Sequence, residues 1–265
     1  MRTVQRAPVS GLVLVVALLT AVQTAVGLGA VGWAVGLSTA TTAAALLAVG
    51  LHRTATTRFG PANAVTLVRA SLGLAVAALV AASFAGPDHR GLLVALTAVA
   101  LALDAVDGRV ARRTGSMTPL GARFDMEADA FLILVLSVAA GPIVGWWVLA
   151  IGFARYALLL AEQTWPWLRV PVPPRYWRKV VAAIQGVTLA IVVSGALPTP
   201  EAVMLLLVAL ALLAESFGRD VLLLVRVHHD LRAPDRGRGR RRVRPATPVV
   251  TPAPVGSHLA RSAGG

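Results

Sequence analysis

The chain has 265 residues, of which 57% are hydrophobic and only 14% charged, and its mean hydropathy is +0.74. These values exclude an ordinary soluble domain and predict a polytopic membrane protein. The formal net charge is +13, and the absence of cysteine excludes disulfide bonds and thiolate chemistry.

The first apolar region, residues 7–51, contains no charged residue and is interrupted by two glycines near its middle. Its length predicts two transmembrane helices, at 9–27 and 30–51, because about 20 apolar residues cross the hydrocarbon core. A cleaved signal peptide is the alternative, since two arginines precede the region. The apolar run is too long for a signal peptide, however, and a second span follows at once.

Six further apolar segments follow and are predicted to be transmembrane helices. They are 64–86, 91–111, 121–141, 144–162, 178–197 and 201–226. The expected fold class is therefore all-α, a polytopic bundle of membrane helices.

Four aspartates lie close together where the second and third of these six segments meet. The segment from Asp104 to Asp129 follows the pattern D-x2-D-G-x2-A-R-x8-G-x3-D-x3-D. A carboxylate near the centre of a membrane helix costs about 2.5 to 3.5 kcal/mol on insertion scales. One such residue could be an internal ion-pair partner, but four together imply a bound cation.

The spacing of these aspartates predicts two acidic helix faces that converge. Asp104 and Asp107 lie three residues apart, and Asp125 and Asp129 lie four apart, so each pair shares a helix face. The connection at 112–121 contains glycine, serine and proline, which favour a turn between antiparallel helices. Oxygen ligands suit a hard ion such as Mg2+ or Mn2+. Four carboxylates could hold two such ions, which commonly clamp phosphate oxygens during an in-line displacement.

Other charged residues near the aspartates lie outside this pattern. Arg123 and Glu127 are spaced i,i+4 and are predicted to form a structural ion pair. Arg155 lies about seven residues inside its predicted span, roughly 10 Å deep at about 1.5 Å per residue. A guanidinium at that depth needs an anion. The candidate partners within the chain are one of the motif carboxylates or Glu162.

A second group of positive side chains, Arg175, Arg178 and Lys179, flanks the next span. Such residues commonly orient a membrane helix. Together with Arg155 they could instead form a basic pocket beside the metals, suited to bidentate contact with a phosphate.

The C-terminal region, residues 231–265, is rich in arginine and then in proline and alanine, without hydrophobic periodicity. This composition predicts a disordered tail. Nucleic-acid binding is one interpretation, but a polybasic segment directly after a membrane span more often contacts anionic lipid head groups, so no nucleic-acid partner is expected. The basic groups at residues 2–6, 53–58, 109–113 and 169–179 and in the tail would share one side of an eight-span bundle, opposite short and poorly charged turns. This arrangement places both termini and the acidic site in the cytoplasm.

The aspartate pattern resembles, position for position, the signature of the CDP-alcohol phosphotransferase (CDP-alcohol phosphatidyltransferase) family, integral membrane enzymes of phospholipid synthesis. The resemblance implies that Asp104, Asp107, Asp125 and Asp129 bind two divalent cations, and that Asp129 is also the base that activates the acceptor hydroxyl. PANAVTLVR, at 61–69, resembles the start of the first core helix of the family. The residues that would contact the CDP-alcohol are Gly108, Ala111, Arg112, Thr118 and Gly121, with Asn63, Thr66 and Arg69 from this upstream segment.

The resemblance also implies a domain organisation and a reaction. An N-terminal membrane extension would occupy 1–57, a six-helix catalytic core 58–230, and the basic tail 231–265. The donor would be CDP-diacylglycerol, CMP would leave, and the enzyme would be a homodimer. The excess of arginine over lysine suggests a bacterial cell membrane. FARYALLLAE and RKVVAAIQG loosely resemble phosphatidylglycerophosphate synthases, which favours glycerol 3-phosphate as the acceptor over an inositol phosphate, serine or a phosphatidyl lipid.

A cation or proton transporter is the alternative from another class, because acidic residues within membrane helices often mark ion pathways. Transporters usually contain inverted repeats with broken helices, and none is visible in the sequence. A family member that has lost catalysis is a third interpretation. All eight signature positions are intact, which argues against it.

Overall fold

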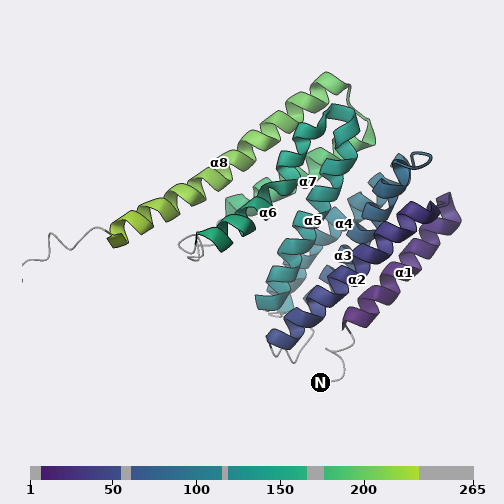
Figure 1. Cartoon of the computed structure of the whole chain (residues 1–265), viewed down its shortest axis with the longest axis horizontal. Helices are drawn as coiled ribbons and strands as arrows, with labels where there is room; N and C mark the ends of the chain where they lie inside the picture. Colours follow the sequence, from purple (N-terminus) through teal and green to yellow (C-terminus); the bar gives the residue numbers. More distant parts are fainter. Residues whose placement is uncertain (1–6, 55–60, 115–118, 166–175, 233–265) are drawn as a thin grey trace, which may run out of the picture.

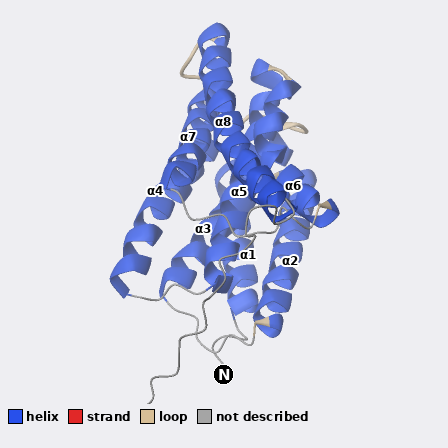
Figure 2. Cartoon of the chain, turned by 90° about the vertical axis from the view of Figure 1, so that its left-hand side faces the viewer, coloured by secondary structure: helices blue, strands red, loops and turns tan. Residues whose placement is uncertain are grey.

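The long apolar runs of the sequence fold into helices. The computed structural model describes the backbone of residues 7–54, 61–114, 119–165 and 176–232. It describes the side chains of residues 7–54, 63–106, 120–165 and 177–225. Figure 2 shows helices joined by loops, and no strand occurs in these described ranges. A helix satisfies its own backbone hydrogen-bonding groups, as a segment inside a bilayer must. The predicted all-α fold class is confirmed.

The described residues contain eight α-helices and one short 3-10 helix, η1. Figure 1 labels the α-helices. In chain order they are α1 (Ala7–Val26), α2 (Gly29–Arg53), α3 (Pro61–Ser83), α4 (Arg90–Thr114), α5 (Pro119–Val144), η1 (Trp146–Val148), α6 (Leu149–Thr164), α7 (Tyr176–Ser194) and α8 (Thr199–Arg232). Each α-helix overlaps one predicted segment. The largest difference is at α8, which continues to Arg232 although its apolar run ends near residue 226.

Six of these helices are long and apolar enough to cross a membrane, namely α1, α2, α3, α5, α7 and α8. The protein is therefore an integral membrane protein. The other two α-helices fall outside this set for different reasons. α6 has only 16 residues, which is short for a membrane span. The side chains of α4 are described only as far as residue 106, so the described part of this helix is also short. Crossing of the bilayer by all eight helices stays a prediction.

Contacts between the connecting loops show that α4, α5, α6 and α7 each have one terminus at the same end of the bundle. Phe84, after α3, stacks on Trp146 of η1, with ring centroids 6.4 Å apart. A Cβ added to Gly195, after α7, would lie 3.3 Å from Arg90 at the start of α4. The α3–α4, α5–α6 and α7–α8 connections therefore lie at one end. The alternating direction of these helices is the arrangement expected of eight spans.

Helix α3 lies at the centre of the bundle, because α1, α2, α4 and α5 all pack against it. Every residue from 71 to 80 is buried. Small side chains permit this close packing. A Cβ added to Gly36 of α2 would lie 3.1 Å from the Ala78 Cβ, and one added to Gly32 would lie 3.1 Å from the Ala78 carbonyl oxygen.

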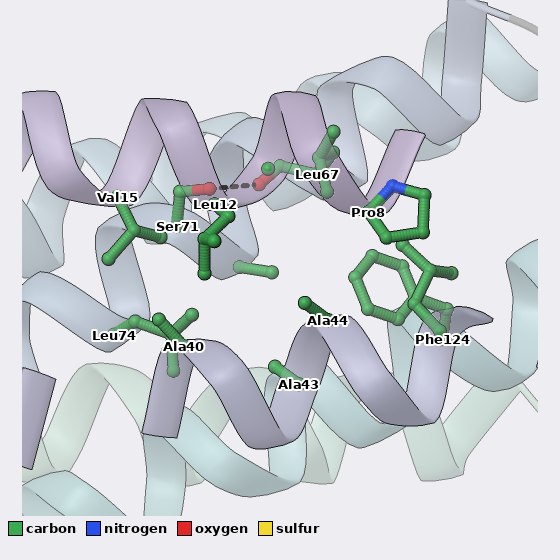
Figure 3. A pocket seen from close by; sticks show the side chains of 13 residues that line it. Pro8, Leu12, Val15, Ala40, Ala43, Ala44, Leu67, Ser71, Leu74 and Phe124 are labelled. Atoms are coloured by element: carbon green, nitrogen blue, oxygen red, sulfur yellow. Dashed lines mark hydrogen bonds between the residues drawn. The ribbon is translucent and has the colours of Figure 1, made fainter. Parts of the chain in front are cut away.

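Helices α1 and α2 form a hairpin that packs on the rest of the chain. Gln23 Oε1 accepts hydrogen bonds from the Leu28 backbone N–H, at 3.1 Å, and from Trp33 Nε1, at 3.0 Å. Figure 3 shows the packing of this hairpin on α3 and α5 around a small cavity. The cavity has a volume of about 20 Å³, enough for one water molecule. Leu67 of α3 and Phe124 of α5 line this cavity. The hairpin thus reaches the first turns of α3 and α5, two of the three helices that contribute to the site described next.

Candidate active site

Helices α4 and α5 bring three of the four motif aspartates together. Asp104 lies in the second half of α4, whereas Asp125 and Asp129 lie in the first three turns of α5. One carboxylate oxygen from each residue lies within 4.8 Å of the others. The three side chains are 36% to 40% exposed, so the cluster is accessible from outside the bundle. The convergence of acidic faces that the spacing predicted is confirmed for these three residues.

A buried arginine from the central helix joins the three carboxylates. Arg69 of α3 is only 3% exposed. Its Nη1 pairs with Asp104 Oδ1 and, at 2.9 Å, with Asp129 Oδ1, and its Nη2 pairs with Asp125 Oδ1. Among the described residues α4 and α5 each pack extensively on α3 rather than on each other. The guanidinium therefore links the two acidic helices through the helix between them.

Two further predicted contact residues lie one and two turns before Arg69. Asn63 and Thr66 are 7% and 3% exposed, and their spacing of three residues places them on the side of α3 that carries Arg69. Gly121 lies one turn before Asp125 on α5. These residues thus lie within two helical turns of Arg69 or Asp125, on the same helices.

Several predicted site residues lie outside what the structure describes. The helix backbone of α4 contains four of them, but their side chains are not described: Asp107, Gly108, Ala111 and Arg112. Thr118 and Arg175 lie outside the described residues altogether. The helical backbone places Asp107 nearly one turn after Asp104.

The three carboxylates fit a divalent cation. Adjacent oxygen ligands of an octahedral ion lie about 3.0 Å apart and opposite ones about 4.2 Å apart, given metal–oxygen distances of about 2.1 Å. The oxygens of the cluster lie within 4.8 Å of one another, so small side-chain rotations would bring them to these separations. All the donors are oxygens, which hard cations prefer. The cluster could therefore hold a metal ion of the predicted class.

Arg155, a predicted acceptor contact, forms an ion pair with an acidic residue of α5 outside the cluster. Its Nη2 donates to Glu127 Oε1 at 2.8 Å, which joins α6 to α5. The predicted pairing of Glu127 with Arg123 is wrong, because the partly buried guanidinium of Arg155 takes this carboxylate and Arg123 is exposed. Spacing within one helix could not show this contact, which arises from the packing of α6 on α5.

One residue of the second basic group, Arg178, also forms an ion pair within the chain. Arg178 of α7 donates through Nε to Asp220 Oδ2 of α8 at 2.6 Å, and Asp220 is 10% exposed on its side chain. Lys179 is exposed. Sequence reasoning missed Asp220, although a carboxylate in the apolar sequence of α8 is a signal that a cationic partner lies nearby.

Comparison with known protein families decides the interpretation of the aspartate cluster. The model of the CDP-alcohol phosphatidyltransferase family matches residues 59–215, which is more than half of the chain. The chain belongs to this family. It is therefore an enzyme of phospholipid biosynthesis that transfers a phosphatidyl group from a CDP-alcohol. The match extends from just before α3 into α8 and leaves α1 and α2 outside. No curated protein and no solved structure gave a significant match.

Proposed function

We propose that this phosphatidyltransferase uses CDP-diacylglycerol as donor and glycerol 3-phosphate as acceptor, and that it releases CMP. The observation that carries the proposal is the convergence of Asp104, Asp125 and Asp129, at the signature spacing, within 4.8 Å. A donor with acyl chains fits an enzyme built from apolar helices, because its tails remain in the bilayer while its diphosphate reaches the cluster.

The four motif aspartates would hold two divalent cations, Mg2+ or Mn2+. When bound, these ions supply Lewis-acid stabilisation of the negative charge on the diphosphate and on the departing CMP. Asp104, Asp125 and Asp129 offer one oxygen each at the cluster. Asp107 would join them from the same helix as Asp104, close to one turn further along α4.

Asp129 acts as the general base in this proposal. Its carboxylate takes the proton of the acceptor hydroxyl, and the acceptor oxygen attacks the phosphorus that bears the diacylglycerol. The new P–O bond forms as the bond from that phosphorus to the CMP oxygen breaks, so the products are a phosphodiester lipid and CMP. A carboxylate is a weak base, and positioning of the two substrates must supply most of the acceleration.

The donor contacts follow from the placement of the signature around the aspartates. Gly108, Ala111 and Gly121 would leave room for the cytidine, and Arg112 and Thr118 would contact the nucleotide. Asn63, Thr66 and Arg69 would reach it from α3. The burial of these three side chains beside the cluster supports this assignment.

The acceptor site is assigned to the basic residues beside the cluster. Arg155 binds Glu127 of α5, the helix that also carries Asp125 and Asp129, but Glu127 is two residues from each of them and so points to another face of that helix. Arg155 Nε is buried and has no hydrogen-bond partner among the described atoms, which leaves a donor that an acceptor phosphate could use. Arg175, Arg178 and Lys179 would add positive charge. A phosphate bound bidentately by Arg155 would have to share it with Glu127 or displace that carboxylate.

An assay of CMP release by the purified protein, with CDP-diacylglycerol and a panel of acceptors, tests the proposal. Glycerol 3-phosphate should support turnover, and free inositol and serine should not. Efficient use of an uncharged alcohol, with no response to glycerol 3-phosphate, would overturn the acceptor assignment and leave the family assignment standing.

We also propose that the enzyme is a homodimer of a bacterial cell membrane, with its active site and both termini in the cytoplasm. The support for this orientation is the distribution of arginines, many of which lie in the last turns of α2, α4 and α8 or in the segments that follow α2, α6 and α8. The domain division, with an N-terminal extension at 1–57, a core at 58–230 and a tail at 231–265, is part of this proposal. The family match from residue 59 onwards supports its first boundary.

A further inference from the structure

Arg69 contacts the aspartates through both terminal nitrogens of its guanidinium. Nη1 bonds to one carboxylate from α4 and one from α5, and Nη2 bonds to Asp125, whose backbone oxygen also lies 3.4 Å from this nitrogen. These carboxylate oxygens, Asp104 Oδ1, Asp125 Oδ1 and Asp129 Oδ1, come from the same three residues that could hold a cation. A cation and the guanidinium would therefore claim the same negative charge.

The burial of Arg69 makes this competition consequential. The side chain is 3% exposed while the three carboxylates surround it, so their withdrawal would leave this guanidinium without its anions. A buried cation without a compensating anion is strongly unfavourable. If divalent cations draw the carboxylates away, Arg69 therefore requires another anion close by. The diphosphate of the donor is the anion that the reaction brings to the cluster.

We propose that Arg69 is an internal counter-ion of the aspartate cluster, which competes with divalent cations for the carboxylates and is transferred to the donor diphosphate when the cations bind. This inference rests on the proposed use of divalent cations but not on the identity of the acceptor. Arg69 keeps the three carboxylates close together without a cation, and it lowers their affinity for a cation in the absence of nucleotide. The cations and the donor then bind together rather than separately.

Arg69→Gln separates this role from that of a simple scaffold. A neutral side chain removes the competing charge, so Mn2+ should bind more tightly to the nucleotide-free variant than to the wild type. We expect at least about a fivefold lower dissociation constant, at the lower end of the usual range for coupled sites. A residue that merely organised the site would have the opposite effect, because its loss would weaken Mn2+ binding.

Mn2+ titration followed by electron paramagnetic resonance measures this affinity without turnover, because free and bound Mn2+ give different signals. The thermal midpoint provides a second readout. In chelator the variant should unfold at a lower temperature than the wild type, since three carboxylates then repel one another. Mn2+ should therefore raise the midpoint of the variant more than that of the wild type. The nucleotide-free protein should also bind CDP more weakly once Arg69 is replaced.

Arg123→Gln is the matched control, because it removes one exposed positive charge from α5 within one turn of Asp125. It should change the Mn2+ affinity less than twofold. Arg69→Lys keeps the charge but has a single terminal nitrogen, so it cannot hold the three carboxylates as the guanidinium does. It is the second variant to use if Arg69→Gln does not fold, and it should also bind Mn2+ more tightly than the wild type.

The possible outcomes distinguish this inference from the proposed function. Mn2+ binding by the wild type, with equal or weaker binding by both Arg69 variants, would overturn the competition and leave the cation requirement intact. Absence of Mn2+ binding by the wild type and by both variants would overturn the cation requirement and this inference together. Tighter binding by the variants supports the inference whichever acceptor the enzyme uses.

Discussion

Individual side chains at the aspartate cluster divide into those that the motif contains and those that other helices supply. The aspartates lie at recognisable spacing, and their grouping is predictable from helix periodicity alone. Arg69 and Arg155 come from α3 and α6, and their carboxylate partners are separated from them by 28 to 60 residues along the chain. The chemistry of the cluster therefore depends on charges that the motif does not include.

Asp129→Asn should lower CMP release about 10²- to 10⁴-fold, because the amide cannot take the proton of the acceptor hydroxyl. The measurement is CMP formation by protein that elutes normally in detergent gel filtration. Asp88→Asn is the matched control, since Asp88 is exposed and pairs with Arg90 in the α3–α4 connection. Normal turnover by Asp129→Asn would contradict the proposed role of this carboxylate.

Arg155→Ala should raise the apparent KM for glycerol 3-phosphate about 10- to 100-fold and leave that for CDP-diacylglycerol within about threefold. The basis is the loss of a charge-assisted hydrogen bond worth about 1.5 to 3 kcal/mol. Glu127→Gln keeps an oxygen that can accept the hydrogen bond from Arg155, so it should change the acceptor KM much less. Equal effects of the two substitutions on stability, with no change in KM, would show that the ion pair is only structural.

The sequence predicts this level of detail only in part. The positions of the four aspartates, and the need of Arg155 for an anion, follow from spacing and from the cost of buried charge. The choice of Glu127 as partner does not follow, because it depends on how α6 packs against α5. Local spacing favoured Arg123, which is exposed and leaves the carboxylate to the more buried arginine.

Helices as elements are well predicted by hydropathy, and the exceptions have physical reasons. α8 extends past its apolar run because a helix can continue into polar residues once it leaves the hydrocarbon region. α5 includes Pro142 and ends at Val144, before Gly145 adopts a φ of 99° and starts the tight connection to η1. The central position of α3 is not visible in its hydropathy, which resembles that of its neighbours.

Close packing of the α1–α2 hairpin on α3 should make the hairpin important for stability. A Cβ added to Gly36 would lie 2.8 Å from Leu19 Cδ1 and 3.1 Å from the Ala78 Cβ. Gly36→Leu should therefore force α2 away from α3 and cost about 1 to 3 kcal/mol. The expected result is a lower thermal midpoint in detergent.

Gly218→Leu in α8 is the control for this experiment, because nothing lies within 4 Å of the added Cβ. Its midpoint should equal or exceed that of the wild type, since leucine is the better helix former. If Gly36→Leu were as stable as this control, the hairpin would not be packed on the core as the structure has it. The test requires no knowledge of the substrate.

At the scale of the whole molecule, one end of the bundle carries the chemistry and the other carries short connections. The aspartates lie in the second half of α4 and the first three turns of α5, and a small apolar cluster formed by Ala7, Leu47 and Leu51 packs against the start of α5. The α3–α4, α5–α6 and α7–α8 connections lie at the opposite end. Hydropathy predicts the number of helices, but these contacts between distant loops show how the helices alternate.

Topology is testable by thiol labelling, because the chain contains no cysteine and each introduced one is unique. Ala85→Cys, Trp146→Cys and Ala196→Cys place exposed positions in the three short connections. Thr54→Cys and Gln163→Cys place exposed positions at the ends of α2 and α6. A membrane-impermeant maleimide should label the first three in intact cells, and the last two only after lysis.

Position 146 decides between two topologies. Eight spans put it outside the cell, whereas a bundle in which α4 and α6 do not cross the membrane would put it inside. Protection of Trp146→Cys together with labelling of Ala85→Cys would contradict eight crossings, and would also conflict with the stacking of Trp146 on Phe84, which holds these two connections together.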